Sequence, residues 1–170
     1  MSIIKYKDQR VAVLLDVQNM YHSAKNLYNS RVNFKEVLKS AVEGRQLIRA
    51  IAYVIKTEAG DEKPFLEALE KIGIQTKIKD LQIFPGGMKK ADWDVGIAMD
   101  AVRLAPKVDA IVIVSGDGDF VPLTEYLRHV QGIQVEAIAF GRSTSQKLKD
   151  AADDFIDLGL EPKKYLMKIH

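Results

Sequence analysis

The sequence predicts an α/β fold, a three-layer α/β/α sandwich built around a mostly parallel central sheet. Apolar runs typical of strands alternate with helical patterns along almost the whole chain of 170 residues. The runs at residues 11–15 and 110–114 are entirely apolar, as expected for strands that are covered on both faces. Strands that alternate with helices imply right-handed crossovers and helices on both faces of the sheet.

Each element follows from its own local pattern. Apolar residues at helical spacing after Asn33 predict a helix that stops at Gly44, and Gly73 caps the next one. Ser143 or Ser145 caps the last helix. The expected strands are 11–15, 47–55, 75–84, 110–114, 133–140 and 155–158, and the expected helices are 33–44, 63–72, 92–104, 119–130 and 143–152. Residues 1–160 then form one domain, followed by a loosely held basic tail at 161–170.

The composition excludes several classes of protein. The chain has no cysteine, so neither a disulfide framework nor a thiolate zinc site is possible. The N-terminus lacks the hydrophobic region of a signal peptide, and no apolar run approaches the ~20 residues of a membrane helix. We therefore expect a cytoplasmic protein without membrane contact. The net charge of +2 is weak evidence about partners, and the sequence leaves open whether the chain forms a homo-oligomer.

Aspartates follow the two most apolar strands. Asp16 comes directly after residues 11–15, and Asp117 and Asp119 come just after residues 110–114. Asp94 lies near the start of a helix that runs antiparallel to the strands, so this start lies at their carboxyl edge. Ligands of open parallel sheets bind at this edge. We therefore expect the four carboxylates to converge there.

Each of these aspartates also has a structural interpretation. Asp16 and Asp119 could cap the helices that follow them, and Asp117 could shape a turn between two glycines. Asp94 could favour the positive end of its helix dipole, with Asp92 as the cap. These roles are compatible with a functional site, because a capping carboxylate retains a second oxygen.

Carboxylates that cluster in this way repel one another and are costly to bury unless a cation neutralises them. Hard oxygen ligands suit Mg²⁺ or Mn²⁺, which keep several waters and bridge to phosphate. The matching reaction is phosphodiester hydrolysis, in which the metal activates a water and stabilises charge on the phosphate oxygens. Asp100 lies six residues beyond Asp94 and is either an outer-shell partner of this site or a surface charge.

Four motifs resemble those of the NYN domain family, also called LabA-like. Asp16-Val17-Gln18-Asn19 resembles the D-x-x-N opening of the family, and residues 94–100 resemble its D-V-x-L-x-x-D helix. Residues 115–123 are similar to its S-G-D-x-D-F-x-P-L segment, and residues 151–156 to its closing A-D-x-F-I. The motifs occur in the family's order and extend over nearly the whole chain, and the S-G-D-x-D-F segment is quite specific.

The resemblance implies a PIN-like nuclease fold and a metal-dependent ribonuclease that hydrolyses single-stranded RNA. The acidic metal ligands that it implies are Asp16, Asp94, Asp117 and Asp119, and it places Asn19 near the metal water or the substrate. PIN nucleases commonly carry a further acidic residue on an earlier helix. The candidates here, Glu36, Glu43 and Glu67, stand in no recognisable motif, and Asp119 could take that place.

Several further residues near this edge are candidates for substrate contact. They are Asn19, Lys89, Lys90, Ser115, Arg142 and Ser143. The two lysines could meet phosphates or belong to a solvated loop, and Ser143 could open a phosphate-binding helix or merely cap it. Trp93 could stack on a base or pack the start of its helix.

Two other functions compete with this interpretation. A catalytically silent RNA-binding or protein-interaction module is disfavoured, because unneutralised aspartates repel anionic RNA. A phosphotransfer enzyme or receiver domain is also disfavoured. A dehalogenase-type phosphatase needs an aspartate where Gln18 stands, and a receiver needs one after the third strand, where residues 84–86 provide none.

Overall fold

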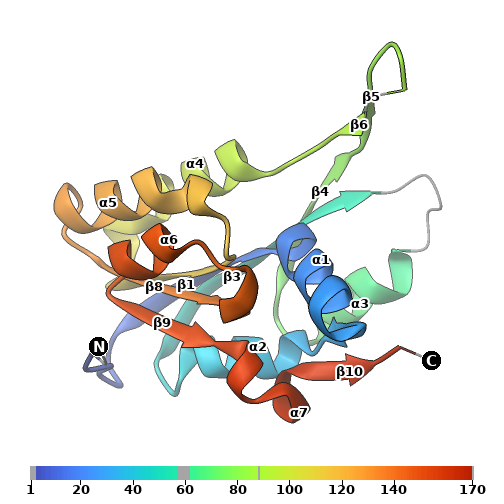
Figure 1. Ribbon diagram of the computed structural model, residues 1–170. Helices are drawn as coiled ribbons and strands as arrows, with labels where there is room; N and C mark the ends of the chain where they lie inside the picture. Colours follow the sequence, from blue (N-terminus) through green and yellow to red (C-terminus); the bar gives the residue numbers. More distant parts are fainter. Residues whose placement is uncertain (1–2, 57–61, 88, 170) are drawn as a thin grey trace.

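The centre of the protein is a sheet of six parallel strands, in a computed structural model that describes residues 3–56, 62–87 and 89–169 (Figure 1). Across the sheet the strands are β4 (Gln75–Asp80), β3 (Gln46–Lys56), β1 (Arg10–Asp16), β7 (Ala110–Val114), β8 (Gln134–Ala139) and β9 (Asp154–Asp157). The two most apolar strands, β1 and β7, are neighbours at the centre, as the sequence predicts. The predicted fold class is therefore confirmed.

Alternate residues of β1 pack into two separate cores, one on each face of the sheet. Val11, Val13 and Leu15 belong to one core, whereas Ala12 and Leu14 belong to the other. This alternation follows from the two-residue repeat of a strand, whose side chains point to opposite faces. Between Arg10 at its start and Asp16 at its end, β1 is therefore entirely apolar.

Helices cover both faces, so the molecule has three layers (Figure 1). The helices on one face are α4 (Asp94–Leu104), α5 (Val121–His129) and α6 (Gln146–Ala151). Those on the other are α1 (Val17–Tyr28), α2 (Phe34–Val42), α3 (Lys63–Lys71) and α7 (Pro162–Tyr165). Short 3-10 helices add η1 (Ala105–Lys107), η2 (Gly118–Phe120), η3 (Gly141–Ser143) and η4 (Leu158–Leu160).

Two small antiparallel pairs lie outside the main sheet. The strand predicted at 75–84 is in fact β4, which ends at Asp80, followed by β5 (Gln82–Ile83). β5 pairs with β6 (Lys89–Lys90) in a hairpin that stands away from the body of the domain (Figure 1). The second pair joins β2 (Ser30–Val32) to β10 (Leu166–Lys168).

The second pair corrects the expectation of a loosely held tail. Tyr165 is 3% exposed and packs in the core beneath α2, and its hydroxyl hydrogen-bonds Ser40 Oγ at 2.6 Å. The backbone of β10 then adds a strand to β2. The segment Pro162–Lys168 is thus held by packing and by backbone pairing, although its sequence is polar and basic.

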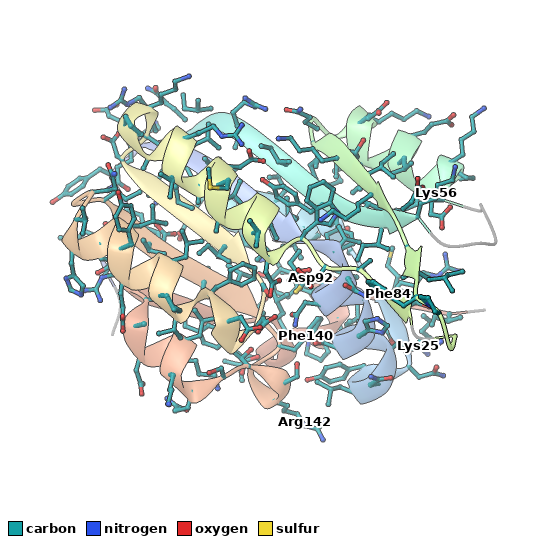
Figure 2. All side chains as sticks on the ribbon, turned by 90° about the horizontal axis from the view of Figure 1, so that it is seen from above. Lys25, Lys56, Phe84, Asp92, Phe140 and Arg142 are labelled. Atoms are coloured by element: carbon teal, nitrogen blue, oxygen red, sulfur yellow. The ribbon has the colours of Figure 1, made fainter. Side chains whose placement is uncertain are left out.

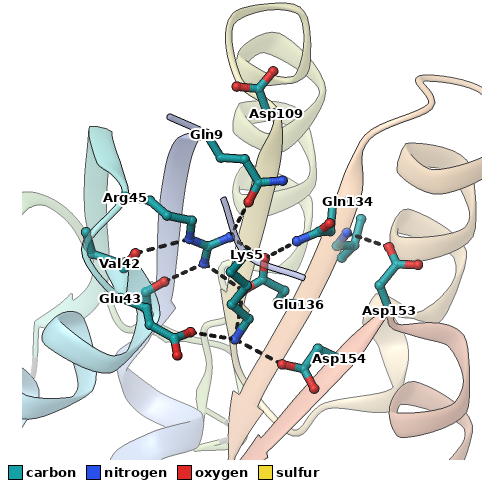
Figure 3. Close-up of polar contacts among 12 residues, drawn as sticks. Lys5, Gln9, Val42, Glu43, Arg45, Asp109, Gln134, Glu136, Asp153 and Asp154 are labelled. Atoms are coloured by element: carbon teal, nitrogen blue, oxygen red, sulfur yellow. Dashed lines mark hydrogen bonds and ion pairs between the residues drawn. The ribbon is translucent and has the colours of Figure 1, made fainter. Parts of the chain in front are cut away.

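A buried ion network closes the sheet at the amino ends of its strands (Figure 3). The guanidinium of Arg45 donates two hydrogen bonds of 2.8 Å to the Glu136 carboxylate, and both side chains are at most 1% exposed. Lys5 adds ion pairs to Glu43, Glu136 and Asp154. Buried charges are tolerated only when they are paired and hydrogen-bonded in this way. The opposite, carboxyl edge carries the candidate site.

Candidate metal centre

Three of the predicted aspartates meet at the carboxyl edge of the sheet. Asp16 ends β1, Asp94 begins α4, and Asp117 lies in the loop after β7. Each offers one carboxylate oxygen, and these three oxygens all lie within 4.8 Å of one another. The strand register accounts for the convergence, because Leu15 pairs with Val114 and the residues that follow them leave adjacent strands side by side.

Asp16 combines a capping role with a place in the cluster. Its Oδ1 accepts a hydrogen bond from the backbone N–H of Asn19 at 3.3 Å, which caps α1. Its Oδ2 accepts one from Ser115 Oγ at 3.0 Å. These two hydrogen bonds fix the orientation of the Asp16 carboxylate beside Asp94 and Asp117.

The sequence suggested Asp119 as the cap of the helix after β7, but no side chain caps the start of α5. Asp117, not Asp119, caps the short helix η2, and its Oδ1 accepts from the backbone N–H of Asp119 at 2.9 Å. Asp119 itself is exposed and lies outside the cluster that satisfies the 4.8 Å limit. Asp119 still lines the pocket around the cluster, so the fourth predicted ligand lies near the other three without joining them.

The cluster lies in an open pocket of about 500 Å³. Its lining comes from α1, from the loops after β7 and β8, and from the start of α4 with the preceding Asp92, which Figure 2 labels. The residues are Asp16, Gln18, Asn19, His22, Ser23, Asn26, Leu27, Asp92, Trp93, Asp94, Asp117, Asp119 and Ser143. Sequence reasoning missed Gln18, His22, Ser23 and Asn26. The spacing of four residues from Gln18 to His22 to Asn26, directly after Asp16, was the available signal.

Burial and like charge raise the pKa values of two members of the cluster. The pKa of Asp94 is raised to about 7 by burial, and next by the negative charges of Asp117 and Asp92. Burial also raises the pKa of Asp16, although hydrogen bonds from Asn19 and Ser115 oppose that shift. Without a cation, Asp94 therefore retains its proton to a higher pH than an ordinary aspartate does.

Ser115 and Asn19 differ in how they face the pocket. Ser115 is fully buried and is absent from the described lining, which corrects the expectation that it contacts substrate. Its hydroxyl donates to Asp16 and accepts from the backbone N–H of Asp117 at 3.2 Å, so it braces two members of the cluster. Asn19 does line the pocket, and its Oδ1 accepts from the backbone N–H of Gly116 at 3.0 Å.

The remaining candidates for substrate contact fall into three groups. Ser143 lines the pocket, and its hydroxyl donates to Ser23 Oγ at 2.9 Å. Arg142 is exposed but does not line the pocket, and Figure 2 shows its side chain extending outward, away from Asp92. Lys89 and Lys90 form β6, and their side chains lie outside the described part of the structure, so both remain predictions.

Asp100 is buried, so it is not a surface charge, and its hydrogen bonds go to residues outside the aspartate cluster. It is 6% exposed and accepts hydrogen bonds of 2.7 Å from the Tyr53 hydroxyl and the Lys77 ammonium. Burial works to raise its pKa, but these two donors outweigh burial and hold the pKa below its usual value. Tyr53 then contacts the ring of Trp93, which lines the pocket, with the ring centroids 5.3 Å apart.

A hydrogen bond and a cation–π contact hold the Trp93 side chain in place. Its indole N–H donates to the carbonyl of Val54 at 3.0 Å, and the ammonium of Lys79 lies 4.5 Å from its ring centroid. The same lysine donates to the carbonyl of Asp92 at 2.9 Å. Both proposed roles of Trp93 are compatible with this geometry, because it packs the start of α4 and also presents part of its surface to the pocket.

A sequence profile of the NYN domain matches residues 10–161, most of the chain. The chain belongs to the NYN domain family. It is similar to the low amplitude and bright protein LabA of Synechococcus elongatus, at 25% identity over 90% of this chain and 86% of the relative. The crystal structure of a protein of unknown function from Vibrio parahaemolyticus shares the fold. Its TM-score is 0.86 and its sequence identity 32%, and the match covers 97% of this chain and 100% of that one.

Membership of the NYN family confirms the resemblance drawn from the four motifs and leaves one departure in place. Of the described lining residues, none is Glu36, Glu43 or Glu67. Glu43 instead pairs with Lys5 at the opposite edge of the sheet, at 3.0 Å. The acidic lining residues beyond the cluster are Asp92 and Asp119, from the segments beside it. Within the described residues, no helix is long and apolar enough to span a membrane.

Proposed function

We propose that this NYN domain is a ribonuclease that hydrolyses phosphodiester bonds of single-stranded RNA with Mg²⁺ or Mn²⁺. The observation that carries the proposal is the cluster of Asp16, Asp94 and Asp117, whose oxygens lie within 4.8 Å of one another in an open pocket. Membership of a family within the PIN-like nuclease superfamily supports the same chemistry.

The donor set fits a hard divalent cation. All three groups are carboxylates, and the chain has no cysteine that would favour a softer metal. When bound, the metal would lower the pKa of a water and offset the charge that develops on the phosphate oxygens. A cation here would also relieve the repulsion that raises the pKa of Asp94.

The proposed roles of the surrounding residues follow from their contacts. Asp16 and Asp117 are oriented by Ser115, and Asp94 projects from the first turn of α4. Asp119 and Asp92 line the same pocket outside the cluster, where each could hold a metal-bound water. Asn19 is held against the loop after β7, so its amide nitrogen is available to the attacking water or the substrate.

Cleavage of a labelled single-stranded RNA tests the proposal. The unmodified protein should cut it in Mn²⁺ or Mg²⁺, and EDTA should abolish the reaction. Asp117→Asn retains the shape of the side chain but removes a charge, so we expect activity to fall by several orders of magnitude. Asp8→Asn is the matched control, because Asp8 is exposed and precedes β1 at the far edge of the sheet.

The outcomes separate an enzyme from a binding module. Loss of cleavage in Asp117→Asn but not in Asp8→Asn supports the nuclease. Equal cleavage by all three proteins would assign the activity to a contaminant. Mn²⁺ should also raise the melting temperature of the unmodified protein and of Asp8→Asn, but not that of Asp117→Asn. RNA binding without cleavage or metal stabilisation would favour the catalytically silent module.

A further inference from the structure

The wall that α1 contributes to the pocket carries a row of neutral polar side chains. Gln18, His22 and Asn26 follow one another at intervals of four residues, and all of them line the pocket. Four residues make little more than one turn of helix, so the row stays on one face of α1 and spans about 12 Å. It begins beside Asp16 and runs away from the carboxylate cluster.

These side chains differ from the other polar residues of the same wall. Asn19 and Ser23 accept hydrogen bonds from Gly116 and Ser143, so they fasten α1 to the loops after β7 and β8. Within the described part of the chain, the side chains of Gln18, His22 and Asn26 have no hydrogen-bonding partner. The ring of Tyr21 approaches the ring of His22 edge-on. His22 and Asn26 are exposed and Gln18 is half-buried, so their polar groups are accessible to a ligand in the pocket.

The chemistry of the row suits a nucleoside better than a phosphate. The described lining contains neither lysine nor arginine, the residues that most often contact phosphate. Asparagine and glutamine instead offer a donor and an acceptor on one amide, which suits base edges and the ribose 2′-hydroxyl. In RNA, the Watson–Crick edges of the bases are accessible in this way where the strand is unpaired.

We propose that Gln18, His22 and Asn26 bind the ribose and base of a nucleotide next to the bond that is cut, and so make this pocket select single-stranded RNA over DNA. The inference rests on the proposed function, which places the phosphate at the aspartate cluster. A strand laid from the cluster along α1 would bring the adjacent nucleoside against the row, where the 2′-hydroxyl distinguishes RNA from DNA.

Binding measured without cleavage tests the inference separately from the nuclease. Labelled RNA and DNA strands of one sequence are titrated with Asp117→Asn, which should leave both intact, and anisotropy gives each Kd. We expect RNA to bind at least about tenfold more tightly. The added Gln18→Ala and Asn26→Ala changes should weaken RNA binding about tenfold and DNA binding less, because DNA shares the base contacts but lacks the 2′-hydroxyl. Added His22→Ala should act in the same direction.

Two matched controls exclude a general loss of affinity. Gln131→Ala and His129→Ala remove the same kinds of side chain near the end of α5, away from the pocket, and should leave both Kd values unchanged. Equal binding of RNA and DNA, binding of neither, or a preference that survives the α1 changes would overturn the inference. RNA cleavage by the unmodified protein would still support the proposed function in those cases. An RNA preference that depends on the row, without any cleavage, would support the selection of RNA by the row and overturn the nuclease, and with it the placement of the row beside a cut bond.

Discussion

The hydroxyl of Ser115 donates a hydrogen bond of 3.0 Å to Oδ2 of Asp16, across the two central strands of the sheet. Both residues come directly after the last position at which β1 pairs with β7, where Leu15 faces Val114. Ser115 is fully buried and accepts a further hydrogen bond from the backbone N–H of Asp117. One small side chain therefore sets the positions of two of the three clustered carboxylates.

Ser115→Ala should weaken the site more than it weakens the fold. Removing the hydroxyl frees Asp16 to rotate, and losses of an outer partner of this kind reduce metal affinity or activity by about tenfold to a hundredfold. The free energy of unfolding should fall by only ~1 kcal/mol for the lost hydrogen bonds. Metal titration and thermal melting measure the two effects. Ser40→Ala, which breaks the distant bond to Tyr165, should reduce stability but not metal affinity.

Much of this site could be predicted because two simple patterns coincide. Entirely apolar runs identify the central strands, and parallel strands bring the residues at their carboxyl ends together, so Asp16 and Asp117 could be placed side by side from the sequence. Asp94 could be placed at the same edge because it lies near the start of a helix that runs antiparallel to the strands. None of this requires knowledge of loop conformation.

The errors arose where tertiary contacts decide the outcome. The sequence does not reveal that a short helix, η2, precedes α5, so it predicts a cap at Asp119 where the structure has one at Asp117. Burial of Ser115 depends on how the loops after β7 and β8 pack. The segment Pro162–Lys168 looks like a tail because its short strand is stabilised only by pairing with β2. The row Gln18, His22 and Asn26 could not be identified from the sequence, because polar residues at this spacing also occur on the solvated faces of helices that line no pocket.

Asp94→Asn should stabilise the metal-free protein in a pH-dependent way. The pKa of Asp94 rises from 3.8 to about 7 on folding, so the unfolded chain releases this proton more readily than the native state. Burial and the neighbouring negative charges both disfavour the ionised form of Asp94. The free energy of unfolding therefore falls progressively as the pH rises from about 4 to about 7, and the loss is constant above that. The substituted amide carries no charge, so the variant's advantage in melting temperature should appear above about pH 4 and level off near pH 7. A constant difference between pH 3 and pH 9 would contradict the assignment.

The same proton should compete with the metal. Because binding requires ionised carboxylates, Mn²⁺ must displace the proton held on Asp94 below about pH 7. We expect Mn²⁺ affinity, measured by calorimetry, to fall about tenfold for each pH unit below that value, with proton release detected as a dependence of the heat on the buffer. In Asp94→Asn the affinity should be lower throughout but should vary less between pH 6 and pH 8.

Asp119 and Asp117 should differ sharply when each is changed to asparagine. Asp117 belongs to the cluster whose carboxylate oxygens lie within 4.8 Å of one another. Asp119 is exposed and lines the pocket outside that cluster. If Asp119 acts through a metal-bound water, Asp119→Asn should reduce RNA cleavage by about tenfold to a hundredfold. Asp117→Asn should reduce it by far more, and only that variant should lose the rise in melting temperature with Mn²⁺. Equal losses would make Asp119 a direct ligand.

Glu136→Gln should destabilise the domain without affecting the metal centre. Its carboxylate receives two hydrogen bonds from Arg45 at 2.8 Å, and both side chains are at most 1% exposed, so the change leaves a guanidinium buried without its counter-charge. Breaking one partner of a buried pair costs about 3–5 kcal/mol, which corresponds to a fall in melting temperature on the order of 10 °C for a domain of this size. Asp109→Asn breaks the exposed pair with Arg10 and should cost far less. The network lies at the amino edge of the sheet, opposite the metal centre. The affinity of folded Glu136→Gln for Mn²⁺ should therefore equal that of the unmodified protein. A loss of affinity would show that the two edges are coupled.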